Sequence, residues 1–167
     1  MKKFIFVVII FNFFSSISYS TESYYIDIDF ILNNSILGKK IIKELNLIKN
    51  KDLIELEKSE KELKDLEKEI SNMKNVLSKE ELEAKINNLK KNIELYREEK
   101  NKKLNNFNNL RSKELSIFLE KIRPHIEEFM KKNSIDIVFE KKNIFIAQSK
   151  YDITLPIIDL LNKKSYD

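Results

Sequence analysis

The chain has no cysteine, one glycine and two prolines among its 167 residues. Without cysteine it can form no disulfide and carry no lipid on an N-terminal cysteine, so stability has to come from packing or from association of copies. A single glycine excludes the phosphate-binding loops and the nucleophile elbow that depend on several. With His125 as the only histidine, the sequence also argues against a zinc site.

Three acidic residues, Asp27, Asp29 and Asp152, are the one group that could converge for acid–base catalysis. A polar strand face and a helix cap explain them more simply. The aromatic residues form no stacking array of the kind that binds nucleic acid. We therefore predict neither an enzyme nor a nucleic-acid-binding protein, and no cofactor or metal.

What the chain does have is charge, since 35% of its residues are charged. Many charges with few helix breakers predict long, solvated helices. The net charge is +4, and removal of Lys2 and Lys3 would leave 29 basic against 27 acidic residues. Such a balance requires no polyanionic partner.

The first twenty residues have the pattern of a secretory signal peptide. Lys2 and Lys3 precede an apolar run from Phe4 to Phe14, and small residues follow at Ser18 and Ser20. We expect cleavage after Ser20 and export of the rest of the chain across the membrane. The alternative, an uncleaved anchor, would need an apolar run of about 20 residues, which is longer than this one.

Residues 24–32 alternate in polarity, with Ile26, Ile28 and Phe30 on one side, and predict a half-buried strand. Ser35 could cap the helix that follows. Gly38, the only glycine, lies where a close approach of two backbone segments or a tight bend is expected.

From Lys39 onward, two seams of mainly apolar residues recur at alternating spacings of three and four, the pattern of a coiled coil. The first seam comprises Ile42, Leu45, Lys49, Asp52, Leu56, Ser59, Leu63, Leu66, Ile70, Met73 and Leu77. The second comprises Leu82, Ile86, Leu89, Ile93, Tyr96, Lys100, Lys103, Phe107, Leu110, Glu114 and Ile117.

Between the seams, Ser78 and Glu81 form a capping box, which marks the start of a new helix. If the chain reverses there, Leu63 lies opposite Tyr96, Ser59 opposite Lys100, and the polar breaks of both seams coincide. The sequence therefore predicts an antiparallel hairpin of helices 39–76 and 79–132, with its tip near 76–80 and a kink near Pro124.

After the hairpin, residues 136–140 and 143–148 predict a β-hairpin, and a terminal helix follows, capped by Asp152 or Thr154 with Pro156 at its first position. The expected fold is α+β and mostly helical: a long antiparallel helical hairpin, a coiled-coil arm, on a small β-sheet body that associates with other copies. Residues 21–38 and 119–167 would form this body, which is too small to bury much apolar surface alone. Residues 39–118 would form the arms.

Two local segments resemble the Skp/OmpH family of periplasmic chaperones. Residues 26–40, IDIDFILNNSILGKK, are similar to the opening strand and first helix start of that family, with Asp27 at its strand aspartate. Residues 119–154 resemble its closing segment, a proline in the last helix followed by apolar strands and Asp-Ile-Thr. The bulkier Tyr25 and Ile26 depart from its usual first strand.

The resemblance implies a homotrimer whose arms surround a cavity. It also implies an ATP-independent holdase for unfolded outer-membrane proteins, with contact to lipopolysaccharide or anionic lipid. Apolar residues outside the seams could line the cavity, although each could equally add to seam packing: Leu47, Leu53, Ile54, Leu95 and Leu104.

The polar breaks at Ser59, Lys100 and Lys103 predict a hinge part-way along the arms that would open the cavity for larger clients. Two other readings remain. One is an exported coiled-coil structural or adaptor protein that binds no clients. The other is a prefoldin-like cytosolic chaperone, which the signal peptide argues against.

Overall fold

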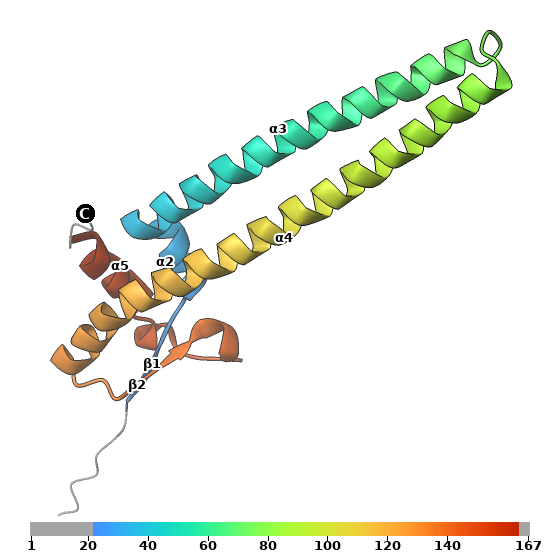
Figure 1. Ribbon diagram of the computed structural model, residues 1–167. Helices are drawn as coiled ribbons and strands as arrows, with labels where there is room; N and C mark the ends of the chain where they lie inside the picture. The colour runs from blue at the N-terminus through green and yellow to red at the C-terminus, as the bar shows by residue number, and fades with distance from the viewer. Residues whose placement is uncertain (1–21, 164–167) are drawn as a thin grey trace, which may run out of the picture.

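A computed structural model describes residues 22–163, so the predicted signal peptide and its cleavage after Ser20 lie outside the described residues. Two long helices, α3 (Ile36–Met73) and α4 (Lys79–Lys132), run side by side in opposite directions and project from a small body (Figure 1). This is the predicted helical hairpin. At 1.5 Å per residue, α3 is about 57 Å long and α4 about 81 Å.

The start of α3 is fixed by Ser35 and Gly38. The Ser35 hydroxyl accepts a hydrogen bond from the Gly38 N–H at 3.1 Å, which caps the helix as predicted. A Cβ atom at Gly38 would lie 1.9 Å from the carbonyl oxygen of Leu32 in the preceding helix. Only glycine permits this contact between two backbones, so the sequence-based expectation of a close approach is confirmed.

At the tip, α3 ends at Met73 and a short turn leads to Ser78. The Ser78 hydroxyl accepts from the Glu81 N–H at 3.2 Å, and the Ser78 N–H donates to the Glu81 carboxylate at 3.0 Å. Both bonds of a capping box are therefore present. They start α4 at Lys79, and the helix continues through Pro124 to Lys132.

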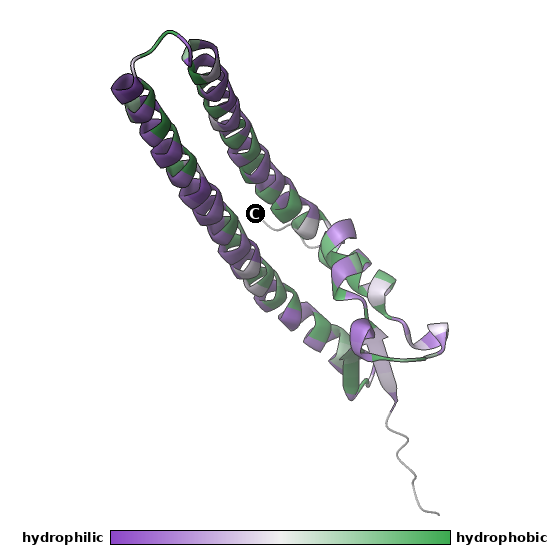
Figure 2. Ribbon diagram, turned by 90° about the vertical axis from the view of Figure 1, so that its right-hand side faces the viewer, coloured by the Kyte–Doolittle hydropathy of each residue, from purple (hydrophilic) through white to green (hydrophobic). Residues whose placement is uncertain are grey.

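The register of the two arms follows from polar contacts between them. Lys85 pairs with Glu69 at 3.0 Å, the Tyr96 hydroxyl donates to Glu60 at 3.4 Å, and Lys103 pairs with Asp52 at 2.9 Å. These contacts confirm the antiparallel arrangement of the arms, but the register differs from the predicted one by about one helical turn, because Tyr96 meets Glu60 where Leu63 was expected. Figure 2 shows arms that are mainly hydrophilic, whereas hydrophobic residues are concentrated in the body.

The predicted strand at 24–32 is wrong in its second half. Strand β1 covers Ser23–Ile26 only, and helix α2 covers Ile28–Asn34. The Asp27 carboxylate accepts a hydrogen bond from the Phe30 N–H at 2.9 Å and so caps α2. As a result Ile31 is fully buried and Phe30 is exposed, the reverse of what an alternating strand would give.

The predicted β-hairpin at 136–148 is also wrong. Strand β2 (Ile137–Glu140) pairs in parallel with β1, with Tyr24 opposite Val138, and forms a two-stranded sheet. The chain then enters a 3-10 turn, η1 (Lys141–Asn143), and residues 144–148 join no strand. An ion pair of Lys141 with Asp27 holds this turn against the end of β1, and Lys142 pairs with Glu140 at the end of β2.

A second 3-10 turn, η2 (Ser149–Tyr151), leads to the last helix, α5 (Thr154–Lys163). The Asp152 carboxylate accepts from the Thr154 N–H at 2.9 Å, as expected of a cap, but Pro156 is the third residue of the helix and not the first. The core of the body lies where α2 and α5 meet the ends of α3 and α4. Its most buried residues are Ile31, Phe118, Ile122, Ile157 and Leu161.

Candidate functional site

The five apolar arm residues singled out by sequence are all solvent-exposed. Their exposed fractions range from 45% to 67%, which rules out close packing in the seam of this chain. They are Leu47, Leu53 and Ile54 on α3 and Leu95 and Leu104 on α4. Exposed side chains of this size on otherwise hydrophilic helices are available for contact with another molecule.

These five residues do not form one patch. Leu53 and Leu104 each follow a member of the Asp52–Lys103 ion pair, so the antiparallel register places both on the same flank of the arms at the same level. Leu95 lies on the opposite flank, in a groove of about 250 Å³ that Ser59 also lines. Leu47 and Ile54 are seven residues apart, which places both on the same face of α3.

Sequence reasoning overlooked Ile48, which is 41% exposed beside Leu47. It also missed a larger exposed apolar surface on the body, formed by β2 and the segment after it. Phe145 is fully exposed, Ile146 is 84% exposed, and Ile137 and Phe139 are partly exposed. The signal was present in the sequence, but these residues were assigned to paired strands and therefore expected to be covered on one face.

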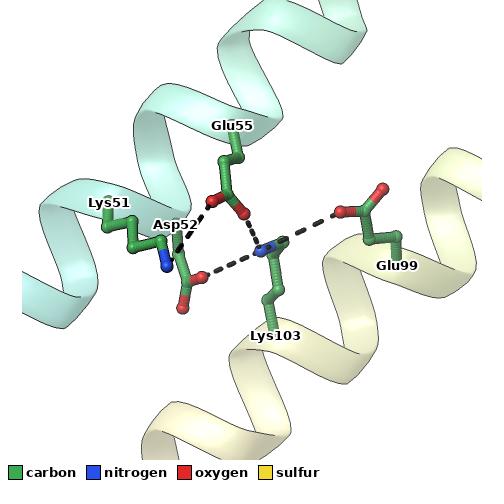
Figure 3. A network of polar contacts seen from close by, with 5 residues as sticks. All are labelled: Lys51, Asp52, Glu55, Glu99 and Lys103. Carbon is green, nitrogen blue, oxygen red and sulfur yellow. Dashed lines mark hydrogen bonds and ion pairs between the residues drawn. The ribbon is translucent and has the colours of Figure 1, made fainter.

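The three residues expected to weaken the arms have different surroundings. Ser59 is half-buried, and Lys100 is exposed at the edge of a groove of about 400 Å³ between the arms, beside Tyr96. Lys103 points between the arms into a cluster of carboxylates (Figure 3). Only 18% of its side chain is exposed.

The Lys103 ammonium group lies 2.6 Å from Glu55 and 2.9 Å from Asp52 on α3, and 3.9 Å from Glu99 on its own helix. Lys51 approaches Glu55 from outside at 4.0 Å (Figure 3). The hydrogen bonds that Lys103 donates to Glu55 and Asp52 raise the pKa of Lys103, and Lys103 in turn lowers the pKa of Glu55. The polar break in the second seam is thus bridged by ion pairs with the first.

The acidic residues of the body are engaged in structural contacts. Asp27 caps α2 and pairs with Lys141 at 3.2 Å. The hydrogen bond from the Phe30 N–H is the main cause that lowers the pKa of Asp27, and Lys141 lowers this pKa further. Asp152 caps the start of α5, and the Asp27 N–H donates to the Thr154 hydroxyl at 2.9 Å. A carboxyl with a lowered pKa stays ionised and is a poor general acid near neutral pH.

Candidate metal sites and candidate membrane-spanning helices are both absent from residues 22–163. No group of three or more histidine, cysteine or acidic side chains in this range is placed to hold a metal ion. None of the helices described there combines the length and apolar character needed to span a bilayer.

The chain matches one family model, that of the outer membrane protein (OmpH-like) family, over residues 23–161. It is also similar to a solved structure from Caulobacter crescentus, a candidate outer membrane chaperone (OmpH-like). The TM-score is 0.73 at 15% sequence identity, and the superposition covers 87% of this chain and 88% of that one. No curated protein matches the sequence. The two structures share their fold across nearly their full lengths.

Proposed function

Because this chain belongs to the OmpH-like family of outer membrane proteins, we propose that it is a periplasmic, ATP-independent holdase for unfolded outer-membrane proteins. The observation that carries the proposal is the set of exposed apolar side chains on long hydrophilic arms. Such a surface can shield an apolar client without a deep specific pocket. The absence of a catalytic or cofactor motif in the sequence agrees with a binding protein that is not an enzyme.

The clients have the matching property. A strand of an outer-membrane barrel is apolar at alternating residues, and it aggregates when it is exposed to water before insertion. Scattered leucine and isoleucine side chains on both flanks of the arms can contact such strands at many points. Dispersed weak contacts suit a protein that has to release its client again.

The proposal includes a homotrimer. In one copy, Phe145, Ile146 and the outer edge of β2 are open to solvent, and an exposed strand edge with apolar neighbours is a site for pairing with another chain. Three copies joined through their bodies would set three arms around a cavity. Lysines along the arms would favour acidic clients, lipopolysaccharide or anionic lipid, in a salt-sensitive way.

The test is an aggregation assay with a urea-unfolded outer-membrane barrel protein diluted into buffer. Stoichiometric purified protein should keep the barrel soluble, and a variant with Leu47, Leu53, Ile54, Leu95 and Leu104 changed to Ser should protect it several-fold less well. The matched control changes five exposed asparagines of the arms to Ser: Asn50, Asn87, Asn88, Asn101 and Asn105. If the wild-type protein leaves the barrel to aggregate, the holdase proposal is wrong.

The second candidate is an exported coiled-coil adaptor that binds no unfolded clients. The hydrophilic character of the arms favours it, because a solvated helical hairpin also serves as a spacer (Figure 2). The aggregation assay separates the two, since an adaptor would give no protection at any ratio.

A further inference from the structure

A groove of about 480 Å³ lies where α2, α3 and α4 meet, at the base of the arms. Its walls include the apolar side chains of Leu32, Ile42, Leu45 and Phe107, all partly buried. The volume falls within the range of ordinary ligand sites, about 300–1,000 Å³. Unlike the scattered leucines of the arms, these four side chains line one groove.

The rim of this groove carries two cations, Lys49 and Arg111, which come from opposite arms. Within residues 22–163 neither has an ion-pair partner, whereas Lys64, Lys85 and Lys103 are all paired with carboxylates. Asp29 is the one carboxylate that lines the groove, and it makes no ion pair with either cation. The groove therefore offers an apolar floor beside two cations that form no ion pair, and with Asp29 included its lining keeps a net positive charge.

We propose that this groove binds an extended segment of unfolded polypeptide in which apolar residues alternate with acidic ones. Charge complementarity selects this occupant: apolar side chains would enter the floor, and neighbouring carboxylates would meet Lys49 and Arg111. An extended strand presents alternate residues on opposite sides, so it can satisfy floor and rim together. This inference rests on the holdase function and adds to it a preferred docking site and a preferred client sequence.

The experiment measures binding of two fluorescein-labelled twelve-residue peptides by anisotropy. One alternates Leu or Tyr with Glu, and the other has Lys in place of every Glu. The wild-type protein should bind the acidic peptide about tenfold more tightly, with a gap that narrows as salt rises. The variant Lys49→Glu/Arg111→Glu should lose about fivefold or more in affinity for the acidic peptide and gain affinity for the basic one.

The matched control is Lys61→Glu/Lys102→Glu, which makes the same change in net charge at two exposed arm lysines outside the groove. Unchanged peptide preference in this control supports the groove as the site. The proposal is overturned if the wild-type protein binds both peptides equally or if both double variants lose affinity alike. Two further measurements on the groove variant can also overturn it. One is a loss of binding to anionic lipid vesicles while peptide binding is unchanged, and the other is a change in oligomeric state.

Failure of the groove proposal and failure of the holdase proposal give different results. If the protein keeps an unfolded barrel soluble but shows no peptide preference, only the groove assignment is wrong. If it protects no barrel and binds neither peptide, the function itself is wrong.

Discussion

At the scale of single residues, Gly38 determines how closely α2 and α3 pack. The nearest atoms to a Cβ at this position would be backbone atoms of Leu32, at 1.9 to 2.8 Å, and backbone cannot move aside as a side chain can. The Ser35 cap, whose hydroxyl accepts from the Gly38 N–H, depends on the same local geometry. A single methyl group therefore forces the two helices apart.

We predict that Gly38→Ala lowers the free energy of unfolding by about 1–3 kcal/mol, the usual cost of overpacking. This loss comes in spite of the better helix propensity of alanine, which is worth about 1 kcal/mol. Urea unfolding followed by circular dichroism at fixed protein concentration measures the change. Lys39→Ala, at the exposed neighbouring position, is the control. Equal midpoints for the wild-type protein and Gly38→Ala would contradict the prediction, because they would show that α2 and α3 can move apart at Gly38 without loss of stability.

Asp27 joins four segments of the body, since it ends β1, caps α2, pairs with Lys141 of η1 and bonds through its N–H to Thr154 of α5. Its pKa is lowered in the folded protein. The stability that its ionised form contributes is therefore present above its unfolded pKa of about 3.9 and is lost as the pH falls through the lower folded value.

We predict that Asp27→Asn, which can still cap α2, is less stable than the wild-type protein at pH 7 and equal to it near pH 2. Asp27→Ala also loses the cap and should cost a further 0.5–2 kcal/mol or so at pH 7. Urea midpoints measured from pH 2 to pH 7 test both. A constant difference between Asp27→Asn and the wild-type protein across this range would contradict the assignment of the charge effect to Asp27.

At the scale of elements, local signals decided which parts were predictable. The start of α4 could be read because the capping box of Ser78 and Glu81 and the phase of both seams agree. Helix α2 was missed because it has only seven residues, and their order of polar and apolar side chains fits an alternating strand as well as a short helix. Only the burial of Ile31 in place of Phe30, and the cap by Asp27, distinguish the two.

Contacts between distant segments account for the other errors. Strand β2 pairs with β1, which precedes it by more than a hundred residues, so nothing near residues 143–148 indicated that they would remain unpaired. Lys103 and Asp52 were both read as breaks in their seams. Their opposite charges were a signal of an ion pair, but the predicted register sets Lys103 opposite Leu56, one helical turn from Asp52, so the pair was missed.

The hinge remains a prediction, and the ion pairs of Lys103 make it more specific. Ion pairs tolerate sliding and water entry better than interlocked leucines do, so the arms should bend at this level. We expect the change of Ser59, Lys100 and Lys103 to Leu to narrow spin-label distance distributions measured across the arms and to reduce capacity for large clients. Changing Asn101, Asn105 and Lys61 to Leu is the control. Unaltered distances and capacity in the first variant would contradict the hinge.

At the scale of the whole molecule, the body has too small a core for the apolar surface that it leaves open. Its buried cluster holds the ends of the arms together, while Phe145 and Ile146 lie outside it and are 103% and 84% exposed. These two large apolar side chains are adjacent in sequence and lie beside an open strand edge. Such a surface is typical of one that another copy covers. The cavity required for a holdase exists only if several bodies associate.

The oligomeric state is therefore the prediction on which the whole-molecule proposal depends. Native mass spectrometry and sedimentation equilibrium of the exported protein should give three times the chain mass, and its thermal midpoint should rise with concentration, because association stabilises the folded bodies. Phe145→Asp/Ile146→Asp should shift the protein toward monomer and reduce client protection in parallel. The control, Lys131→Asp/Lys132→Asp, introduces the same two aspartates at exposed residues at the end of α4 and should leave the trimer intact. A wild-type monomer at micromolar concentration would contradict the shared cavity, and the arms of a single chain would then have to act alone.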